Sequence, residues 1–382
     1  MAGQRDSTSD PAGSLDYKTS GVDYAPLDAF KRACQQAAGT TRHVLSTTGY
    51  REVLGIRGES AFLLEADDHF LAHVEEGLGT KNLVADAVAR ATGRCHYRAI
   101  GIDTVATMVN DLITCGARPV SIAMHAAVGD GAWFNDEHRA RELAAGFAQG
   151  CIDSGAVWGG GETPALKGLI SPETIVLAGS AVGTIQPKSR LVQADIKDGD
   201  AIVFLSSSGV HTNGLTLCRA IADKLPDGFQ TPVTSTESFG ELLLKPSVIY
   251  AQFVQQVLDA KLRARYFVHM TGHGWRKLMR PESPWVFRID RHTAPGESVP
   301  PLFEFIIKHG PVARREAYAT FNMGVGWAVY LDPDDAEMCV RIARSLGHQA
   351  WVAGRVMREN DRRAVEIPGE QIVFEADTLS VR

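Results

Sequence analysis

Short, largely apolar segments recur along the chain and constrain its fold more than any other feature. The clearest examples are residues 61–64, 120–123, 175–178, 201–205 and 327–331. Each has the length of a β-strand, and stretches with helical periodicity lie between them. The sequence therefore predicts a mixed fold of helices and strands.

The length of the chain predicts two domains. Its 382 residues exceed the size at which a single hydrophobic core usually stops growing, about 250–300 residues. Polar turns at residues 186–190 and 197–200 precede a new apolar strand, which is typical of a boundary. We predict a polar, flexible tail at residues 1–15, an N-terminal domain at 16–185 and a C-terminal domain at 186–382.

Composition excludes several classes of partner. The net charge is −6 and Lys and Arg form no stripe, which argues against nucleic acid or an anionic membrane as a partner. No apolar run approaches the roughly 20 residues of a membrane helix, and the polar N-terminus does not resemble a signal peptide. The six cysteines include no Cys-x-x-Cys pair, so we expect neither disulfides nor zinc, and we expect a cytoplasmic protein.

A glycine-rich turn at residues 77–81 has the chemistry of a phosphate site. Gly77 and Gly79 let backbone N–H groups approach an anion, Thr80 adds a hydroxyl, and Lys81 adds a point charge. Glu76 precedes the turn and could hold the divalent cation that phosphates need. The spacing is not that of a Walker A loop, and an ordinary strand-to-helix turn is the alternative.

The segment 101–111 places two acids in a predicted helix whose apolar residues share one face. Asp103 would lie at the helix start, where it could cap the helix or bind a ligand. Asp111 lies two turns further on, and a carboxylate there either faces solvent or serves a metal.

Further polar clusters follow predicted strands. Three glycines at 159–161 deliver Glu162 at a tight turn, an arrangement that favours a metal or phosphate neighbourhood. The segment 206–217, with His211 and Asn213, joins a strand to a helix and could form an anion-binding nest or a capped turn with a surface His. His269 begins a similar glycine-containing junction.

These clusters, in this order, resemble the AIR synthetase family, the phosphoribosylformylglycinamidine cyclo-ligases of purine biosynthesis. The similar segments span almost the whole chain: 17–23, 77–81, 101–111, 159–163, 207–214, 244–250, 269–275 and 320–326. Many motifs in one order are far more specific than any one of them.

The resemblance implies a two-domain α+β fold in which the N-terminal sheets of two chains pair into an intersubunit β-barrel. It implies a homodimer, with ATP and Mg²⁺ as cofactors and a small ribonucleotide as substrate. In the implied reaction, ATP phosphorylates the formamide oxygen of formylglycinamidine ribonucleotide, and an amidine nitrogen then closes the imidazole ring. Phosphorylation makes a poor leaving group a better one, so metal, Lys and oriented donors can supply most of the catalysis.

The resemblance also implies roles for particular residues. The predicted magnesium ligands are Glu76, Asp103 and Asp111. The residues predicted to bind ATP are Lys18, Gly77, Gly79, Thr80, Lys81, Asp103, Asn110, Asp111, Gly160, Gly161, Glu162 and Asn213. The predicted catalytic residues are His211, His269, Glu162 and Asp103, and the two histidines are the candidates for proton transfer.

Several positions depart from the family pattern, and they leave the substrate open. Glu76 stands where the family usually has Asp, His273 interrupts a run of glycines, and residues 124–126 and 164–167 also differ. Two alternatives are open. The protein could be a paralogue that activates another amide or carboxyl group, or it could be a non-catalytic nucleotide-binding regulator. Selenophosphate synthetase would carry a reactive Cys or selenocysteine before Lys18, and the hydrogenase-maturation dehydratase would end in Cys. Thiamine-monophosphate kinase matches the central motifs less well.

Overall fold

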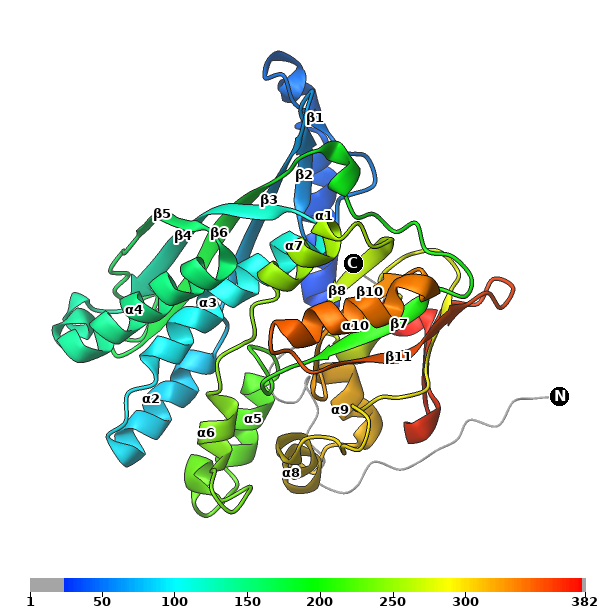
Figure 1. Ribbon diagram of the computed structural model, residues 1–382. Coiled ribbons are helices and arrows are strands. Elements are labelled where there is room, and N and C mark those ends of the chain that lie inside the picture. Colours follow the sequence, from blue (N-terminus) through cyan, green and yellow to red (C-terminus); the bar gives the residue numbers. More distant parts are fainter. Residues whose placement is uncertain (1–23, 380–382) are drawn as a thin grey trace.

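Two mixed β-sheets, one in each half of the chain, form the framework of the protein (Figure 1). The structure is a computed structural model that describes residues 24–379. The predicted tail at 1–15 and Lys18 lie outside the described residues. The sheets are separated between Ile185 and Ala201, and the predicted boundary at 185/186 falls in that interval.

The N-terminal sheet has six strands in the order β1-β2-β3-β6-β4-β5. The bounds are β1 (Arg51–Glu52), β2 (Phe62–Glu65), β3 (Phe70–Gly77), β6 (Ile175–Ile185), β4 (Arg118–Val128) and β5 (Val157–Glu162). Only the β4–β5 pair within this sheet is parallel. Burial alternates along β6, as expected for a sheet with one face on a core.

Four helices accompany this sheet: α1 (Tyr24–Gly39), α2 (Lys81–Thr92), α3 (Tyr97–Leu112) and α4 (Glu137–Ser154). The helix α3 packs against β3 and β6 on one side and against α4 on the other. It is buried along most of its length, which explains its apolar composition. Two glycines, Gly101 on α3 and Gly146 on α4, let these helices approach closely, since a Cβ on either would overlap the backbone of the other helix.

The C-terminal sheet has seven strands in the order β13-β12-β9-β11-β7-β10-β8. The bounds are β13 (Ile372–Glu375), β12 (Ala364–Ile367), β9 (Val286–Ile289), β11 (Ala350–Met357), β7 (Ala201–Ser206), β10 (Val325–Leu331) and β8 (Ala264–His269). β10 is buried along its whole length and β7 along all but its last residue, because both of their faces are covered. All five strand predictions are confirmed, as β2, β4, β6, β7 and β10.

The helices of this half are α5 (Leu215–Ala222), α6 (Phe239–Leu243), α7 (Ala251–Asp259), α8 (Pro301–His309), α9 (Arg314–Thr320) and α10 (Ala336–Ser345). A 3₁₀ helix, η6 (Gly274–Met279), follows β8 and borders the site described below. The prediction of a two-domain α+β fold is confirmed.

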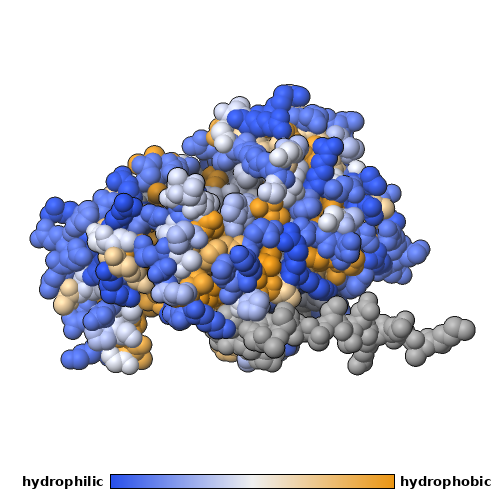
Figure 2. All heavy atoms as spheres, turned by 90° about the horizontal axis from the view of Figure 1, so that it is seen from below, coloured by the Kyte–Doolittle hydropathy of each residue, from blue (hydrophilic) through white to orange (hydrophobic). Residues whose placement is uncertain are grey.

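Hydrophilic side chains cover much of the face seen in Figure 2, with smaller groups of apolar residues between them. Within residues 24–379, no helix combines the length and the apolar character needed to cross a membrane.

Candidate active site

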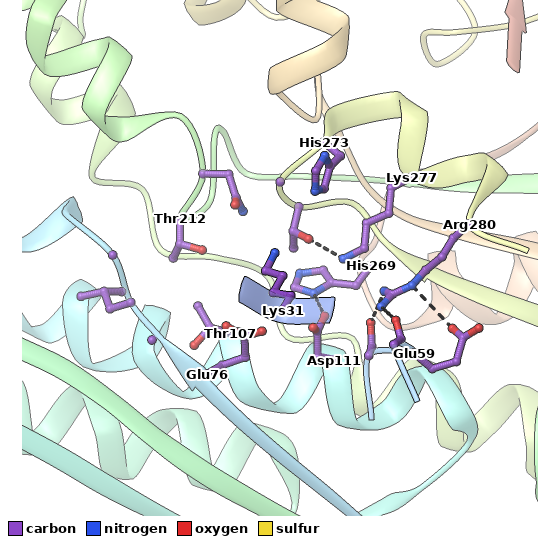
Figure 3. A pocket seen from close by; sticks show the side chains of 18 of the residues that line it. Lys31, Glu59, Glu76, Thr107, Asp111, Thr212, His269, His273, Lys277 and Arg280 are labelled. Atoms are coloured by element: carbon purple, nitrogen blue, oxygen red, sulfur yellow. Dashed lines mark hydrogen bonds and ion pairs between the residues drawn. The ribbon is translucent and has the colours of Figure 1, made fainter. Parts of the chain in front are cut away.

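A cavity of about 490 Å³ lies where the two halves of the chain meet, and both halves contribute to its walls (Figure 3). The N-terminal half supplies residues 58–60, 76–79, Thr107 and Asp111. The C-terminal half supplies Thr212, Asn213 and residues of the segment 269–280. Its volume is within the usual range for a small-molecule site.

Two carboxylates, Glu76 and Asp111, line one side of this cavity. Glu76 lies near the end of β3, and Asp111 lies in the last turn of α3. Desolvation in the cavity and repulsion by Asp111 raise the pKa of Glu76 to about 7. Burial opposes ionisation of Asp111, but Lys277 and a hydrogen bond from His269 outweigh burial and lower its pKa. One of the two carboxylates is therefore firmly ionised, while the other titrates near neutrality.

His269 contacts Asp111 directly, with Nδ1 of the ring 2.7 Å from Oδ1 of the carboxylate. β8 ends at His269, so the strand presents the ring to α3 across the cavity. Burial lowers the pKa of His269, although Asp111 works against that shift. With Asp111 ionised, the Nδ1 proton occupies this bond, which leaves Nε2 as the basic nitrogen of the ring.

Basic side chains line the other side of the cavity. Lys277 and Arg280 extend from η6 and its C-terminal end, and Lys31 extends from α1 (Figure 3). Arg280 donates to Ser60 Oγ at 2.7 Å and lies 3.6 Å from the Glu59 carboxylate. The cavity thus places cations opposite acids, an arrangement suited to an anion that binds a metal on its other side.

His273 also lines the cavity, in a left-handed conformation with φ of 71°. Non-glycine residues seldom adopt this conformation, and such strain concentrates at functional sites. Burial, Arg276 and Lys277 lower the pKa of His273 to about 3, so the ring is neutral at physiological pH.

The predicted glycine-rich turn forms part of the cavity wall. Gly77 ends β3, Gly79 has φ of +77°, and α2 begins at Lys81. Gly77 and Gly79 line the cavity on one side, while Asn213, from the turn before α5, lines it from the C-terminal half. Thr80 is the N-cap of α2, and its hydroxyl makes no capping hydrogen bond.

Lys81 and Asp103, both predicted to contact ATP or metal, form an ion pair with each other. Each side chain is 0% exposed, and the Lys81 Nζ lies 2.7 Å from Asp103 Oδ2. The Lys81 ammonium also donates to the Lys245 carbonyl, and Ser247 donates to Asp103 through its backbone N–H and its hydroxyl. Neither residue lines the cavity. This ion pair instead joins the N-terminal half to residues 245–247.

The prediction that Asp103 begins a helix is wrong, because α3 begins at Tyr97 and Asp103 lies in its interior. In the sequence, the stripe of apolar residues is clear from Val105 onward, which favours a helix start near Asp103. Buried residues upstream, among them Tyr97 and Ile100, extend the helix toward its true start.

Asn110 also holds the two halves together, whereas His211 bonds within the C-terminal half. Asn110 donates to the Val248 carbonyl at 2.8 Å and accepts from the Tyr250 N–H at 3.0 Å. The ring of His211 is 2% exposed, and its Nε2 accepts from the N–H groups of Ser208 and Val248. Burial lowers the pKa of His211 well below its usual value. The alternative of a surface His at this position is therefore wrong.

Glu162, Gly160 and Gly161 lie on β5, the outermost strand of the N-terminal sheet, and all three are exposed. They do not line the cavity formed by this chain. Gly161 is required by the sheet itself, since a Cβ there would overlap the backbone of Met124 on β4. A Cβ on Gly160 would meet nothing within 4 Å, but Gly160 has a positive φ of 145°.

The fit of Mg²⁺ rests on the carboxylates of the cavity. Within residues 24–379, no group of three or more His, Cys, Asp or Glu side chains could hold a metal ion. Mg²⁺ usually needs only one or two protein carboxylates when phosphate and water complete its octahedron. Glu76 and Asp111 meet that requirement, and their mutual repulsion is the kind that a cation relieves.

The sequence analysis missed several residues of the cavity, among them three basic ones: Lys31, Lys277 and Arg280. The signal for two of them was present, because Lys277 and Arg280 follow the predicted junction at 269–275 and their spacing of three is one helical turn. Lys31 had no comparable signal, since it lies in an unremarkable polar helix.

Comparison with known proteins agrees with this architecture. Residues 58–185 match the model of the AIR synthase related protein N-terminal domain, and residues 197–366 match that of the C-terminal domain. Phosphoribosylformylglycinamidine cyclo-ligase of Pseudothermotoga lettingae is 32% identical over 94% of this chain and 98% of its own length. The enzyme of that name from Carboxydothermus hydrogenoformans is 31% identical over 92% and 98%.

Among solved structures, the hydrogenase maturation protein HypE in complex with ATP superposes with a TM-score of 0.57 at 15% identity. The match covers 82% of this chain and 85% of that protein. At this identity it supports the fold alone. Family models match both halves of the chain, and its relatives are more than 30% identical over nearly their full length. The chain therefore belongs to the AIR synthase family.

Proposed function

We propose that the protein is an ATP-dependent cyclo-ligase that converts formylglycinamidine ribonucleotide to aminoimidazole ribonucleotide. The main structural support is one cavity that is lined by Glu76, Asp111 and Lys277 and in which His269 is hydrogen-bonded to Asp111. The names of the relatives support the same activity.

The proposed reaction has two steps. The formamide oxygen attacks the γ-phosphorus of ATP, the bond from that phosphorus to the bridging oxygen breaks, and ADP leaves. The amidine nitrogen then attacks the activated carbon, the C–O bond breaks, and inorganic phosphate leaves with the electron pair. The nitrogen loses a proton as the imidazole ring forms.

The residues of the cavity divide these tasks. His269 Nε2 accepts the proton from the cyclising nitrogen, and Asp111 orients the ring and stabilises its charged form. Backbone N–H groups at Gly77 and Gly79, with the Asn213 amide, would bind phosphate oxygens. Glu76 and Asp111 would hold Mg²⁺, which neutralises phosphate charge when bound. Lys81, Asp103 and Asn110 act by fixing the two halves relative to each other. His211 fixes Ser208 and Val248 within the C-terminal half.

Some expected contributors lie outside this cavity. We propose that the N-terminal sheets of two chains pair into a β-barrel, which would bring the exposed Glu162, Gly160 and Gly161 to the subunit interface. Lys18 would approach ATP from the N-terminal segment. Light scattering after gel filtration measures the mass, and a monomer at micromolar concentration would overturn the dimer. A cytoplasmic location accompanies the proposal, since the substrates are soluble metabolites.

The decisive assay incubates purified protein with formylglycinamidine ribonucleotide, MgATP and buffer, and follows aminoimidazole ribonucleotide by colour development and ADP by coupled oxidation of NADH. We expect both products in a one-to-one ratio. ADP release that requires a different amide or carboxylate would indicate the paralogue. Tight ATP binding without turnover of any such substrate would indicate the regulator.

A further inference from the structure

Lys277 differs from the other buried cations of the protein in having no ion pair within the described residues. It is 9% exposed, and its Nζ donates a hydrogen bond to Thr271 Oγ1. Lys81 is buried more completely but is paired with Asp103, and Arg280, which is partly buried, lies beside Glu59. A buried charge is costly unless another charge or a ligand compensates it.

The position of Lys277 indicates what compensates it. Lys277 lines the 490 Å³ cavity, where Figure 3 shows its side chain, and it also lines a second cavity of about 230 Å³. The Thr271 bond uses one of its three donor directions. Glu76 and Asp111 act on Lys277 through space across the cavity without forming an ion pair with it.

A multivalent oxyanion fits the space between these groups. It can offer one oxygen to the ammonium and others to a cation held by the carboxylates, which a neutral ligand cannot do. The proton-transfer pair His269 and Asp111 lies beside Lys277, so the oxyanion there is the one at the reacting centre. In the reaction proposed above, that group is the γ-phosphoryl group of ATP.

We propose that Lys277 is a catalytic residue that binds the oxygens of the γ-phosphoryl group during its transfer. The assignment rests on the proposed function for the identity of the reaction, but the use of ATP can be tested without turnover. A compact ammonium already held in place by Thr271 needs no reorganisation as charge develops on the transferring group. Loss of such a donor costs about 100- to 1,000-fold in kcat.

The test compares nucleotides that differ in the γ-phosphoryl group. Calorimetric titrations measure the Kd of AMP-PNP and of ADP, each with Mg²⁺, for the wild-type protein and for Lys277→Met and Lys277→Arg. We expect Lys277→Met to raise the Kd of AMP-PNP by about 10- to 100-fold, the usual effect of losing one charge-assisted hydrogen bond. The Kd of ADP should change by less than about 3-fold. Lys277→Arg should restore part of the affinity for AMP-PNP that Lys277→Met loses.

Two controls separate a contact with nucleotide from a structural role. Lys308→Met removes an exposed Lys on α8 and should leave both Kd values unchanged. Thermal unfolding of each variant shows whether it is folded. Thr271→Val removes the hydroxyl that holds the Lys277 ammonium in place but keeps the ammonium itself. Equal weakening of AMP-PNP and ADP by Lys277→Met, or no weakening of either, would overturn the proposal. The wild-type protein could fail to cyclise the ribonucleotide while Lys277→Met selectively weakens the binding of AMP-PNP. That result would refute the cyclo-ligase activity and still support the contact of Lys277 with the γ-phosphoryl group.

Discussion

His269 on β8 and Asp111 on α3 share a 2.7 Å hydrogen bond, although 158 positions separate them in the chain. The bond joins the two halves of the protein at the wall of the cavity. It brings two distant motifs together into the pair that we propose transfers the proton.

Asp111→Asn should lower kcat by at least about 100-fold, because an amide neither fixes the His269 tautomer nor stabilises its protonated form. Steady-state assays of Asp111→Asn, His269→Ala and the double variant measure the coupling. We expect the double variant to be little worse than either single one. Asp361→Asn, at a fully exposed carboxylate, is the matched control. Independent, multiplicative losses would mean that Asp111 acts apart from His269.

The Lys81–Asp103 ion pair should contribute mainly to stability. Removing either partner leaves a buried charge uncompensated, so Lys81→Met or Asp103→Asn should each reduce the free energy of unfolding by about 3–5 kcal/mol. Replacing both residues, as in Lys81→Met with Asp103→Asn, should cost less than the sum of the single changes. Urea unfolding monitored by circular dichroism gives the three values. If the variants kept their stability but lost nucleotide binding, Lys81 and Asp103 would instead belong to the ligand-binding site.

Glu76 should make stability depend on pH near neutrality. Its pKa in the folded protein is about 7, above that of an exposed Glu. The folded state therefore retains a proton that the unfolded chain has released, so this stabilisation is complete below about pH 4.5 and is lost as pH rises through 7. In metal-free buffer, the Tm of the wild-type protein minus that of Glu76→Gln should fall over this interval. A constant difference would show that Glu76 titrates normally, and added Mg²⁺ should raise the wild-type Tm at pH 8.

The close crossing of α3 and α4 predicts a steric effect far from the cavity. A Cβ at Gly146 would overlap the carbonyl of Arg98, so Gly146→Ala should destabilise the protein by about 1–3 kcal/mol or more. Gly131→Ala is the matched control, since a Cβ there has nothing within 4 Å. Equal Tm values for the two variants would mean that the helices can separate at little cost.

The sequence predicted the strands and the motifs well, because apolar runs and glycine-rich turns are local signals. It predicted roles less well. Lys81 and Asp103 have the residue types of a phosphate and metal site, but a local pattern does not reveal that each is the other's partner. Lys277 was overlooked because its significance depends on its burial beside a cavity whose walls come from segments far apart in the sequence. The Asp111–His269 contact likewise required the tertiary fold.

The segment 245–250 has a mechanical consequence for ligand entry. Asp103 holds Ser247 through two hydrogen bonds, and Asn110 holds Val248 and Tyr250 through two more. Any hinge motion that parted the halves would have to break all of them in a dry interior, where each unmade bond is expensive. The two halves around the cavity are therefore held at a fixed separation. Ligands are selected by the size and charge of a cavity that already has its shape before they bind.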